Sequence, residues 1–456
     1  MALKRTNVLL EKIMLVTAVS EEIGRQPEYI DFYDSAKGLL IMKDAFVSVI
    51  DGLITYVGQN RSMAEAAFAD MKYEKYNGKS KLVWPSMANT HGHIPMTLMR
   101  NRTDDHNLHD WLFNVIFPME AHLTAEHVFS GAELGLAEMI RHGTGAAADM
   151  YYFSDSVAEA ASQAGFRLNV CCDGKLEGSD CRSHVSTSEI AGFKQRWESG
   201  RNGLIRTSLL VHSIYLYEPY LYEELAEAVQ EHNMFVQVHI SETIKEVEDC
   251  LVKYGKRPPQ QLDEFGLLNG PVIAAHCVHL DDDDRALLAA RKVTVAHNPA
   301  SNFKLGSGFA DVTAMIRAGI NVSLGTDGAA SNNNLDLYQE MRLAGFLAKG
   351  LTGDASVLPA GQLIRMATLN GMQGLGFDKT GCLLPGWKAD LQIVDIDHPS
   401  MQPLGDPEAA LIYSCSSSYV ESLMVDGVWL MYKNELKTID EERAVAQANY
   451  YAGRLG

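Results

Sequence analysis

Two histidines separated by one glycine, His91 and His93, follow the apolar segment KLVWPSMANT. Alternate side chains of a β-strand point the same way, so two imidazoles spaced i, i+2 at a strand end can bind one metal ion from one side. Two neighbouring histidines among fifteen are also typical of ordinary surface or core residues, so the pair alone is a weak signal. It makes metal chemistry the first hypothesis.

Further polar side chains stand at the ends of other short apolar, β-branched runs. They are His239 in MFVQVHISE, His276 in VIAAHCVHL, His297 in KVTVAHNPAS and Asp327 in NVSLGTDGAAS. Such runs are typical of buried parallel strands. Because the carboxyl ends of parallel barrel strands meet at one face, these side chains are expected to lie together.

The elements that must position them alternate along the middle of the chain. From residue 85 to about residue 378, short apolar runs alternate with longer stretches of helical period, which is typical of βαβ units. Eight strand and helix pairs over about 290 residues predict an α/β fold with a (β/α)8 TIM barrel. The active site is then expected where the strands' carboxyl ends meet.

The two flanking segments, 1–84 and 379–456, carry β patterning instead. Asp51-Gly52 and Asp426-Gly427 are hairpin signals between alternating segments. Two β pieces on either side of a barrel predict one small β-sandwich built from both termini.

Composition narrows the class of protein. A net charge of −19 without any Lys/Arg block argues against nucleic-acid and acidic-membrane partners. No apolar run approaches the ~18 residues that span a bilayer, and Glu11 and Lys12 interrupt the apolar N-terminal stretch before it resembles a signal peptide. Seven scattered cysteines without CxxC spacing fit a reducing compartment. We expect a soluble cytoplasmic protein.

Three imidazoles and one carboxylate form a ligand set for one borderline metal ion such as Zn²⁺, with a position left for water. The predicted ligands are His91, His93, His239 and Asp327. Fe²⁺ accepts the same donors, so ligand identity leaves it open. His212, rather than a lysine, ends the fourth run, and without a bridging lysine we expect a single metal ion. Asp327 would orient the attacking water and take its proton.

Two more groups are predicted to act on the reaction. Glu242, three residues after His239, can enter the pocket without ligating the metal and is interpreted as a proton shuttle. His276 could hydrogen-bond the attacking oxygen and stabilise a tetrahedral intermediate. Taken singly, each side chain also fits a satisfied structural hydrogen bond.

These residues lie in motifs that resemble the amidohydrolase superfamily. NTHGHIPMTLMR, VHISET, AAHCVHL, HNPASNFKLGSG, LGTDGAASNN and GWKADLQIVDID are similar, over nearly the whole chain, to its methylthioadenosine/adenosylhomocysteine deaminase group. The resemblance implies a zinc-dependent aminohydrolase and a homo-oligomer. It further implies that His212 contacts the purine, Glu120 the ribose hydroxyls, and that Trp111 lines the pocket. The implied reaction is attack of activated water at purine C6 while Glu242 protonates N1, with loss of ammonia.

Departures from the family pattern concern the far end of the substrate. Ser162 and Cys172 stand where members acting on adenosylhomocysteine carry arginines that hold the amino-acid carboxylate. Losing a bidentate arginine would leave that carboxylate poorly paired, unless Lys175 or Arg182 compensates. Adenosine and methylthioadenosine are therefore ranked above adenosylhomocysteine.

Two alternatives stay open. One is an aminohydrolase for another aminated heterocycle such as guanine, cytosine, a pterin or an s-triazine. The other is a catalytically silent metal-binding scaffold on the same barrel, which would be expected to have lost part of the ligand set.

Overall fold

A computed structural model of the chain describes residues 3–102, 105–172, 187–199 and 203–455. Its centre is a sheet of eight parallel strands in sequence order. They are β7 (Met87–Asn89), β8 (Thr144–Asp149), β9 (Arg167–Cys172), β10 (Ile205–His212), β11 (Phe235–Ile240), β12 (Val272–His276), β13 (Thr294–His297) and β14 (Asn321–Leu324). All eight predicted runs form these strands.

The sheet closes into the predicted barrel at the junction of its first and last strands. The Thr90 amide donates to the Leu324 carbonyl over 2.9 Å, and the Thr90 and Ser323 hydroxyls are 2.7 Å apart. Ala88, Ala146, Ala148 and Ala296 are fully buried in one apolar cluster that also contains Ile273 and Phe377. A dry apolar cluster therefore supports these strands.

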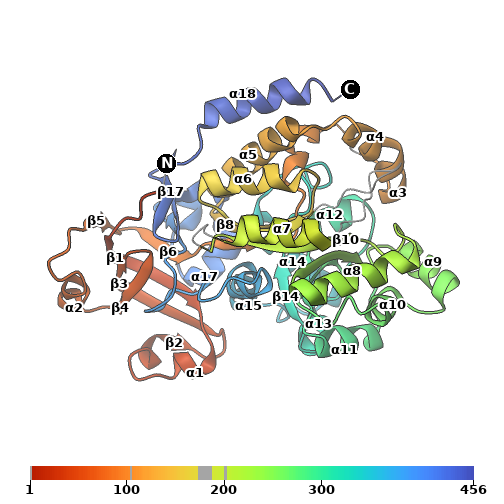
Figure 1. The fold of residues 1–456 in the computed structure, drawn as a ribbon. Coiled ribbons are helices and arrows are strands. Elements are labelled where there is room, and N and C mark those ends of the chain that lie inside the picture. The colour runs from red at the N-terminus through yellow and green to blue at the C-terminus, as the bar shows by residue number, and fades with distance from the viewer. Residues whose placement is uncertain (1–2, 103–104, 173–186, 200–202, 456) are drawn as a thin grey trace.

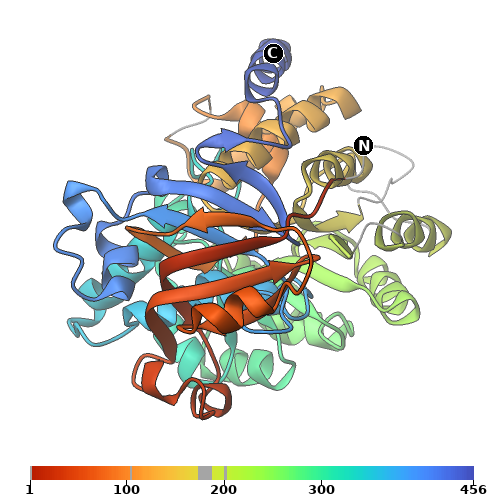
Figure 2. The same cartoon turned by 90° about the vertical axis from the view of Figure 1, so that its left-hand side faces the viewer.

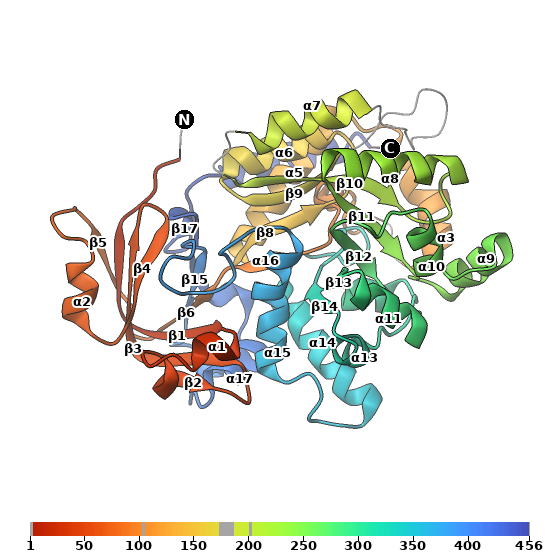
Figure 3. The same cartoon turned by 60° about the horizontal axis from the view of Figure 1, so that its bottom comes forward.

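Helices surround the barrel, as Figures 1 and 3 show. The larger ones are α5 (Ala125–Arg141), α6 (Ser154–Ala164), α7 (Thr187–Glu198), α8 (Pro219–His232), α9 (Ile244–Tyr254), α10 (Pro258–Glu264), α11 (Asp282–Ala290), α13 (Val312–Arg317), α14 (Leu337–Thr352) and α15 (Ala360–Arg365). Short helical segments complete the middle of the chain: η2 (Ile94–Met99), α3 (Leu108–Trp111), η3 (Leu112–Ile116), α4 (Phe117–Glu120), α12 (Pro299–Lys304), η4 (Met366–Asn370) and α16 (Gly371–Gly374). No helix among the described residues is both long and apolar enough to cross a bilayer.

Strands from both termini join in one mixed sheet of ten strands, which confirms that the two ends of the chain fold together. The N-terminal strands are β1 (Val8–Ala18), β2 (Tyr33–Asp34), β3 (Leu39–Ile50), β4 (Leu53–Gly58), β5 (Glu74–Asn77) and β6 (Lys81–Pro85); the C-terminal strands are β15 (Leu391–Asp395), β16 (Val420–Val425), β17 (Val428–Tyr432) and β18 (Glu435–Leu436). Figure 2 shows the red N-terminal strands beside the blue C-terminal strands. β6 pairs antiparallel with β15 and links the two groups.

Both predicted hairpins are present. Asp51-Gly52 joins β3 to β4 and Asp426-Gly427 joins β16 to β17, with positive φ at all four residues. Such φ values favour glycine and match the turns that connect twisted antiparallel strands. The remaining helical segments are α1 (Glu21–Gly24), η1 (Ile30–Phe32), α2 (Arg61–Ala66), η5 (Pro399–Met401), α17 (Pro407–Ala409), η6 (Ala410–Ser414), η7 (Ser417–Tyr419) and α18 (Glu441–Ala452).

The run KLVWPSMANT is divided between the two sheets. Its first half is β6 of the mixed sheet, whereas Met87–Asn89 forms β7 of the barrel. The Ser86 amide bonds the Asp390 carbonyl at 3.1 Å, and the next amide, of Met87, bonds the Gly143 carbonyl of the barrel at 3.0 Å. One residue thus changes the strand's partner and delivers His91 and His93 to the barrel rim.

Candidate metal centre and active site

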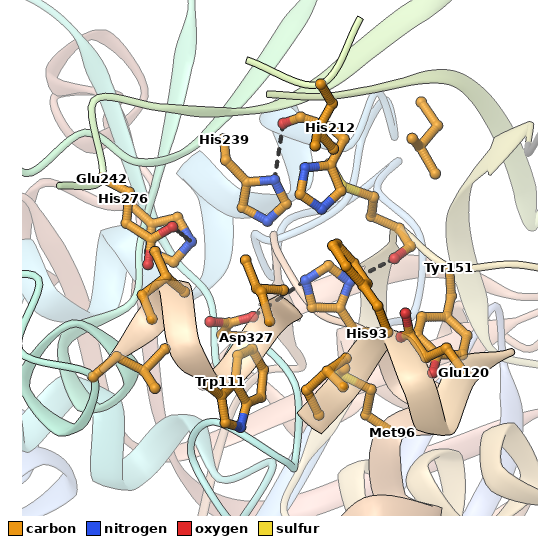
Figure 4. A pocket seen from close by; sticks show the side chains of 18 of the residues that line it. His93, Met96, Trp111, Glu120, Tyr151, His212, His239, Glu242, His276 and Asp327 are labelled. Atoms are coloured by element: carbon orange, nitrogen blue, oxygen red, sulfur yellow. Dashed lines mark hydrogen bonds and ion pairs between the residues drawn. The ribbon is translucent and has the colours of Figure 1, made fainter. Parts of the chain in front are cut away.

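The predicted metal-binding side chains converge at the carboxyl ends of the barrel strands. His91 and His93 follow β7, His239 lies near the end of β11, and Asp327 follows β14. The carboxylate Oδ1 of Asp327 is 3.5 Å from His91 Nε2 and 3.3 Å from His93 Nε2. The His239 ring centroid is 4.8 Å from that of His91 and 5.5 Å from that of His93. Figure 4 shows His93, His239 and Asp327 pointing into one space.

Two overlapping groups of these donors could hold a metal ion. Ligand atoms of His91, His93 and Asp327 lie within 4.8 Å of one another, and so do those of His91, His239 and His276. His91 belongs to both groups. The structure therefore brings the four predicted ligands together and places His276 beside them.

Hydrogen bonds to the far ring nitrogens orient two of the imidazoles. His93 Nδ1 lies 2.5 Å from the Met150 carbonyl, and His239 Nδ1 lies 2.9 Å from the His212 carbonyl. Since a carbonyl can only accept, each Nδ1 carries the proton and each Nε2 is left as a free electron-pair donor. This is the tautomer that a metal ligand requires.

The surroundings of His91, His239 and Asp327 favour the protonation states that metal binding would require. Burial lowers the pKa of His91 to about 4 and that of His239 well below its usual range, so both rings are neutral at pH 7. Burial alone would raise the pKa of Asp327, but the approach of His91 Nε2 to 3.5 Å and the other neighbouring imidazoles outweigh it and hold this pKa well below its usual range. The His91 Nε2 atom is buried without a hydrogen-bond partner. A neutral, unsatisfied nitrogen beside an ionised carboxylate fits a borderline divalent cation.

Asp327 is fixed by its own contacts. The Ser301 hydroxyl donates to Oδ2 at 2.5 Å and the Gly328 amide donates to Oδ1 at 2.7 Å. Its backbone has a φ of 62°, a left-handed conformation that is uncommon outside glycine. The chain therefore maintains strain at this position to aim the carboxylate.

Glu242 and His276 form a second pair beside the ligand cluster. His276 Nε2 is 3.8 Å from Glu242 Oε2, and His276 Nδ1 is 2.7 Å from Asn302 Oδ1. Burial raises the pKa of Glu242. Burial would lower the pKa of His276, but the charges of Glu242 and Asp327 exceed this effect and raise it. Both pKa values are thus shifted upward, which favours the protonated form of each group.

The three predicted substrate contacts, Trp111, Glu120 and His212, all line the same pocket. The pocket contains about 890 Å³ of empty space, part of it open to solvent, and Glu242, His276 and Asp327 line it as well. Burial raises the pKa of Glu120 to about 8. Figure 4 shows Glu120 near Tyr151, away from the Glu242 and His276 side of the pocket.

One wall of the pocket was not predicted from the sequence. The segment α3, η3 and α4 contributes the apolar side chains Leu108, Trp111, Leu112, Ile116 and Phe117. Its middle part, η3, is a π-helix, a form that occurs mostly as short insertions and often at functional sites. The segment also carries Glu120, so one stretch of chain supplies both Trp111 and Glu120 to the pocket.

Several predicted residues lie elsewhere. His297 is buried at the end of β13 but is not among the described residues that line the pocket, and neither are Ser162 and Cys172. Lys175 and Arg182 fall outside the described residues. Among the described lining residues there is no lysine or arginine.

Other residues that act on the site were missed in the sequence. Ser301, Asn302 and Ser307 follow His297 in HNPASNFKLGSG and hydrogen-bond Asp327, His276 and Glu242 respectively. Their position directly after a barrel strand was a usable signal. The partner of each could not be chosen without the tertiary structure.

Comparisons with known proteins agree with this geometry. The profile of the Amidohydrolase family matches residues 82–430. The 5-methylthioadenosine/S-adenosylhomocysteine deaminase of Acetivibrio thermocellus is 41% identical over 417 residues, covering 91% of this chain and 95% of the relative. The corresponding deaminase of Dictyoglomus turgidum is 43% identical over 383 residues, covering 83% and 89%. A crystal structure of a zinc-bound adenosine deaminase from Xanthomonas campestris superposes with a TM-score of 0.87 at 32% identity, covering 100% of this chain and 99% of that one.

Proposed function

Since this chain belongs to the amidohydrolase family, we propose that it is a metal-dependent deaminase that converts an adenine nucleoside to its inosine analogue and ammonia. The observation that carries the proposal is the pocket itself. It joins Asp327, Glu242 and His276 on one side to Glu120 on another. A nucleoside has a base to react with the first group and a diol to bind the second.

His91, His93, His239 and Asp327 would hold the metal ion, which we propose to be a single Zn²⁺; the Xanthomonas campestris deaminase was likewise solved with bound zinc. When bound, the ion acidifies water so that hydroxide is supplied near neutral pH. Metal analysis of the purified protein tests this assignment. One zinc per chain is expected, and a protein without stoichiometric metal would favour a silent scaffold instead.

The chain's own residues then move the protons. Asp327, with one oxygen held by Ser301, accepts a proton from the attacking water. Glu242, whose pKa is raised by burial, carries a proton to N1 of the purine ring. His276 lies 3.8 Å from Glu242 and hydrogen-bonds the oxygen that attacks C6. The proton held by Asp327 then passes to the amino group, the hydroxyl proton of the adduct returns to Glu242, and the C6–N bond breaks to release ammonia.

Substrate orientation falls to the other residues of the pocket. Glu120 can accept hydrogen bonds from two neighbouring ribose hydroxyls, because one carboxyl group offers two oxygens. His212 contacts the purine, and Trp111 provides an apolar wall. Without a lysine or arginine among the described lining residues, a carboxylate on the 5′ substituent has no partner there. Adenosine and methylthioadenosine therefore rank above adenosylhomocysteine.

Glu242→Gln is the sharpest test of the reaction. It should keep the metal content, because Glu242 is not a ligand, and lower turnover by roughly 10²- to 10⁴-fold, the usual contribution of a general acid or base. Glu248→Gln, an exposed change on α9, is the matched control. Near-normal turnover of Glu242→Gln would contradict the role of Glu242 as the proton shuttle.

A substrate panel separates the proposed activity from the alternatives. Adenosine, methylthioadenosine and adenosylhomocysteine are compared with guanine, cytosine, a pterin and an s-triazine by ultraviolet absorbance. A preference for the free bases would contradict the role given to Glu120. We also propose that the protein is a homo-oligomer, which light scattering of the purified protein checks.

A further inference from the structure

Glu246 is a buried acid whose carboxylate is turned toward the backbone rather than toward a cation. It lies in the first turn of α9 and is only 6% exposed. Its Oε1 accepts from the Ser241 amide and its Oε2 from the Glu242 amide, both at 2.8 Å. Among the described residues, no ion pair involves Glu246. Both of its oxygens are therefore committed to the turn that carries Glu242.

The backbone of that turn adopts an uncommon conformation. Ser241 has a φ of 50°, in the left-handed region, and its carbonyl accepts from the His279 amide at 2.9 Å. The amides of Ser241 and Glu242 are in a buried part of the chain, where an unsatisfied N–H costs about 1 to 3 kcal/mol. The Glu246 carboxylate satisfies both and so holds the turn in this conformation.

The arrangement goes beyond ordinary helix capping. Thr243 is the N-cap of α9, and its hydroxyl accepts from the Glu246 amide at 3.2 Å. In a capping box, the acidic side chain would bond back to the amide of the N-cap residue itself. Here the Glu246 carboxylate instead bonds the amides of the two residues before Thr243, so it constrains the backbone of Glu242.

The Glu242 side chain has few constraints of its own. Its Oε1 accepts from the Ser307 hydroxyl at 3.2 Å, and its Oε2 faces His276 Nε2 at 3.8 Å. The direction of the side chain therefore depends on how firmly its backbone is held. We propose that Glu246 is a positioning residue that fixes Glu242 for proton transfer. This inference rests on the proposed function, because it assumes that Glu242 is the proton shuttle.

Glu246→Gln tests the proposal with little change in volume. The amide group keeps one acceptor but turns an NH₂ toward the second backbone N–H, so the turn loses one hydrogen bond. We expect kcat to fall about 10- to 100-fold, the range typical of lost supporting contacts, while KM changes less than about threefold and metal content is unchanged. Glu248→Gln, exposed on the same helix, should change neither constant.

A double-mutant cycle distinguishes positioning from a general structural role. If Glu246 acts through Glu242, adding Glu246→Gln to Glu242→Gln should lower the remaining kcat by less than about twofold. An equal loss in both backgrounds, or a normal kcat in Glu246→Gln, would overturn the proposal. If Glu242→Gln alone is fully active, the proposed function fails instead, which is a separate outcome.

A variant that does not fold would leave the cycle incomplete. In that case Glu246→Asp takes its place, because it keeps the charge but is one methylene too short to reach both amides. The same cycle is run with the same two readings. A kcat loss that vanishes in the Glu242→Gln background supports positioning, and a loss that persists there overturns it.

Discussion

Buried polar groups find hydrogen-bond partners at one end of the barrel and lack them at the other. At the amino end, Arg167 of β9 is 3% exposed and forms two hydrogen bonds with Asp390, whose side chain is fully buried, at 2.5 and 3.0 Å. The Asp426 amide adds a third bond to Asp390 at 2.7 Å. At the carboxyl end, the buried Nε2 atoms of His91 and His276 have no hydrogen-bond partner.

The difference distinguishes a structural contact, between the barrel and the mixed sheet, from a ligand-binding site. Buried polar groups in proteins are ordinarily satisfied, and an unpaired one needs an explanation. Arg167 and Asp390 complete each other and attach the barrel to the mixed sheet. The histidines at the other end have bonding capacity left over, which an external ligand can use.

Removing a ligand at the carboxyl end should have the largest effect. His239→Ala takes away one imidazole of the cluster and is expected to lower turnover at least about 10³-fold, as loss of several kcal/mol of metal-supplied stabilisation would. Metal content and kcat are measured together. His122→Ala, an exposed histidine, serves as control. Full metal occupancy in His239→Ala would show that the metal site is not at this cluster of histidines.

Breaking the ion pair between Arg167 and Asp390 should lower the stability of the fold and leave turnover unchanged. Asp390→Asn removes the nearer counter-charge of the buried Arg167 guanidinium and leaves the more distant Asp426, whose Oδ1 is 3.7 Å away, so we expect the free energy of unfolding to fall by about 3 kcal/mol. Turnover per folded molecule should stay the same. Denaturant unfolding measures the first quantity. The double change Arg167→Met with Asp390→Leu should recover most of the loss, and no recovery would argue against a role limited to charge pairing.

A smaller effect is expected where a neutral group supports a ligand. Ser301→Ala removes the 2.5 Å hydrogen bond to Asp327 Oδ2 without removing the ligand. Metal affinity should weaken about 10- to 100-fold. Titration of the metal-free protein with Zn²⁺ gives the value. An unchanged affinity would mean that the Gly328 amide alone orients the carboxylate.

The last effect, on stability and not on the reaction, concerns Glu340, a fully buried acid of α14 that accepts hydrogen bonds from the Ala300 amide and the Asn332 side-chain amide. Burial raises its pKa from 4.5 to about 8. Between these two pH values the folded protein retains a proton that the unfolded chain releases. The contribution of Glu340 to the free energy of unfolding is therefore fully present below about pH 4.5 and is lost as the pH rises to about 8. Glu340→Gln cannot titrate. Its melting temperature should fall less between pH 5 and 8 than that of the parent, and parallel curves would contradict the shift.

The sequence was sufficient for the barrel because most of its strands are separate apolar runs, and six of the eight have a named polar residue at or just after their end. The hairpins at Asp51 and Asp426 were equally local signals. The division of KLVWPSMANT was not visible, since the run is apolar on both sides of Ser86 and only its hydrogen-bond partners differ. Local patterns predict an element well, but they do not say which sheet receives it.

The residues that support the site could not be predicted from the sequence for a related reason. Ser307 bonds Glu242 across 65 positions of sequence, and Ser301 bonds Asp327 across 26. Serine in a loop has many possible partners, so its residue type carries little information. The π-helix in the wall of the pocket was hidden as well, because LFNVI has neither a capping residue nor a clear period. These features depend on the assembled barrel.

The pairing of β6 with β15 has a consequence for synthesis of the chain. Pro85 lies opposite Leu391, so the two strands are about 300 residues apart in order of translation. At roughly 5 to 20 residues per second, one edge of β6 waits on the order of 15 to 60 s for its partner. An unpaired apolar strand edge is a template for aggregation. The β6 edge therefore lacks its β15 partner until residues 391–395 have been synthesised.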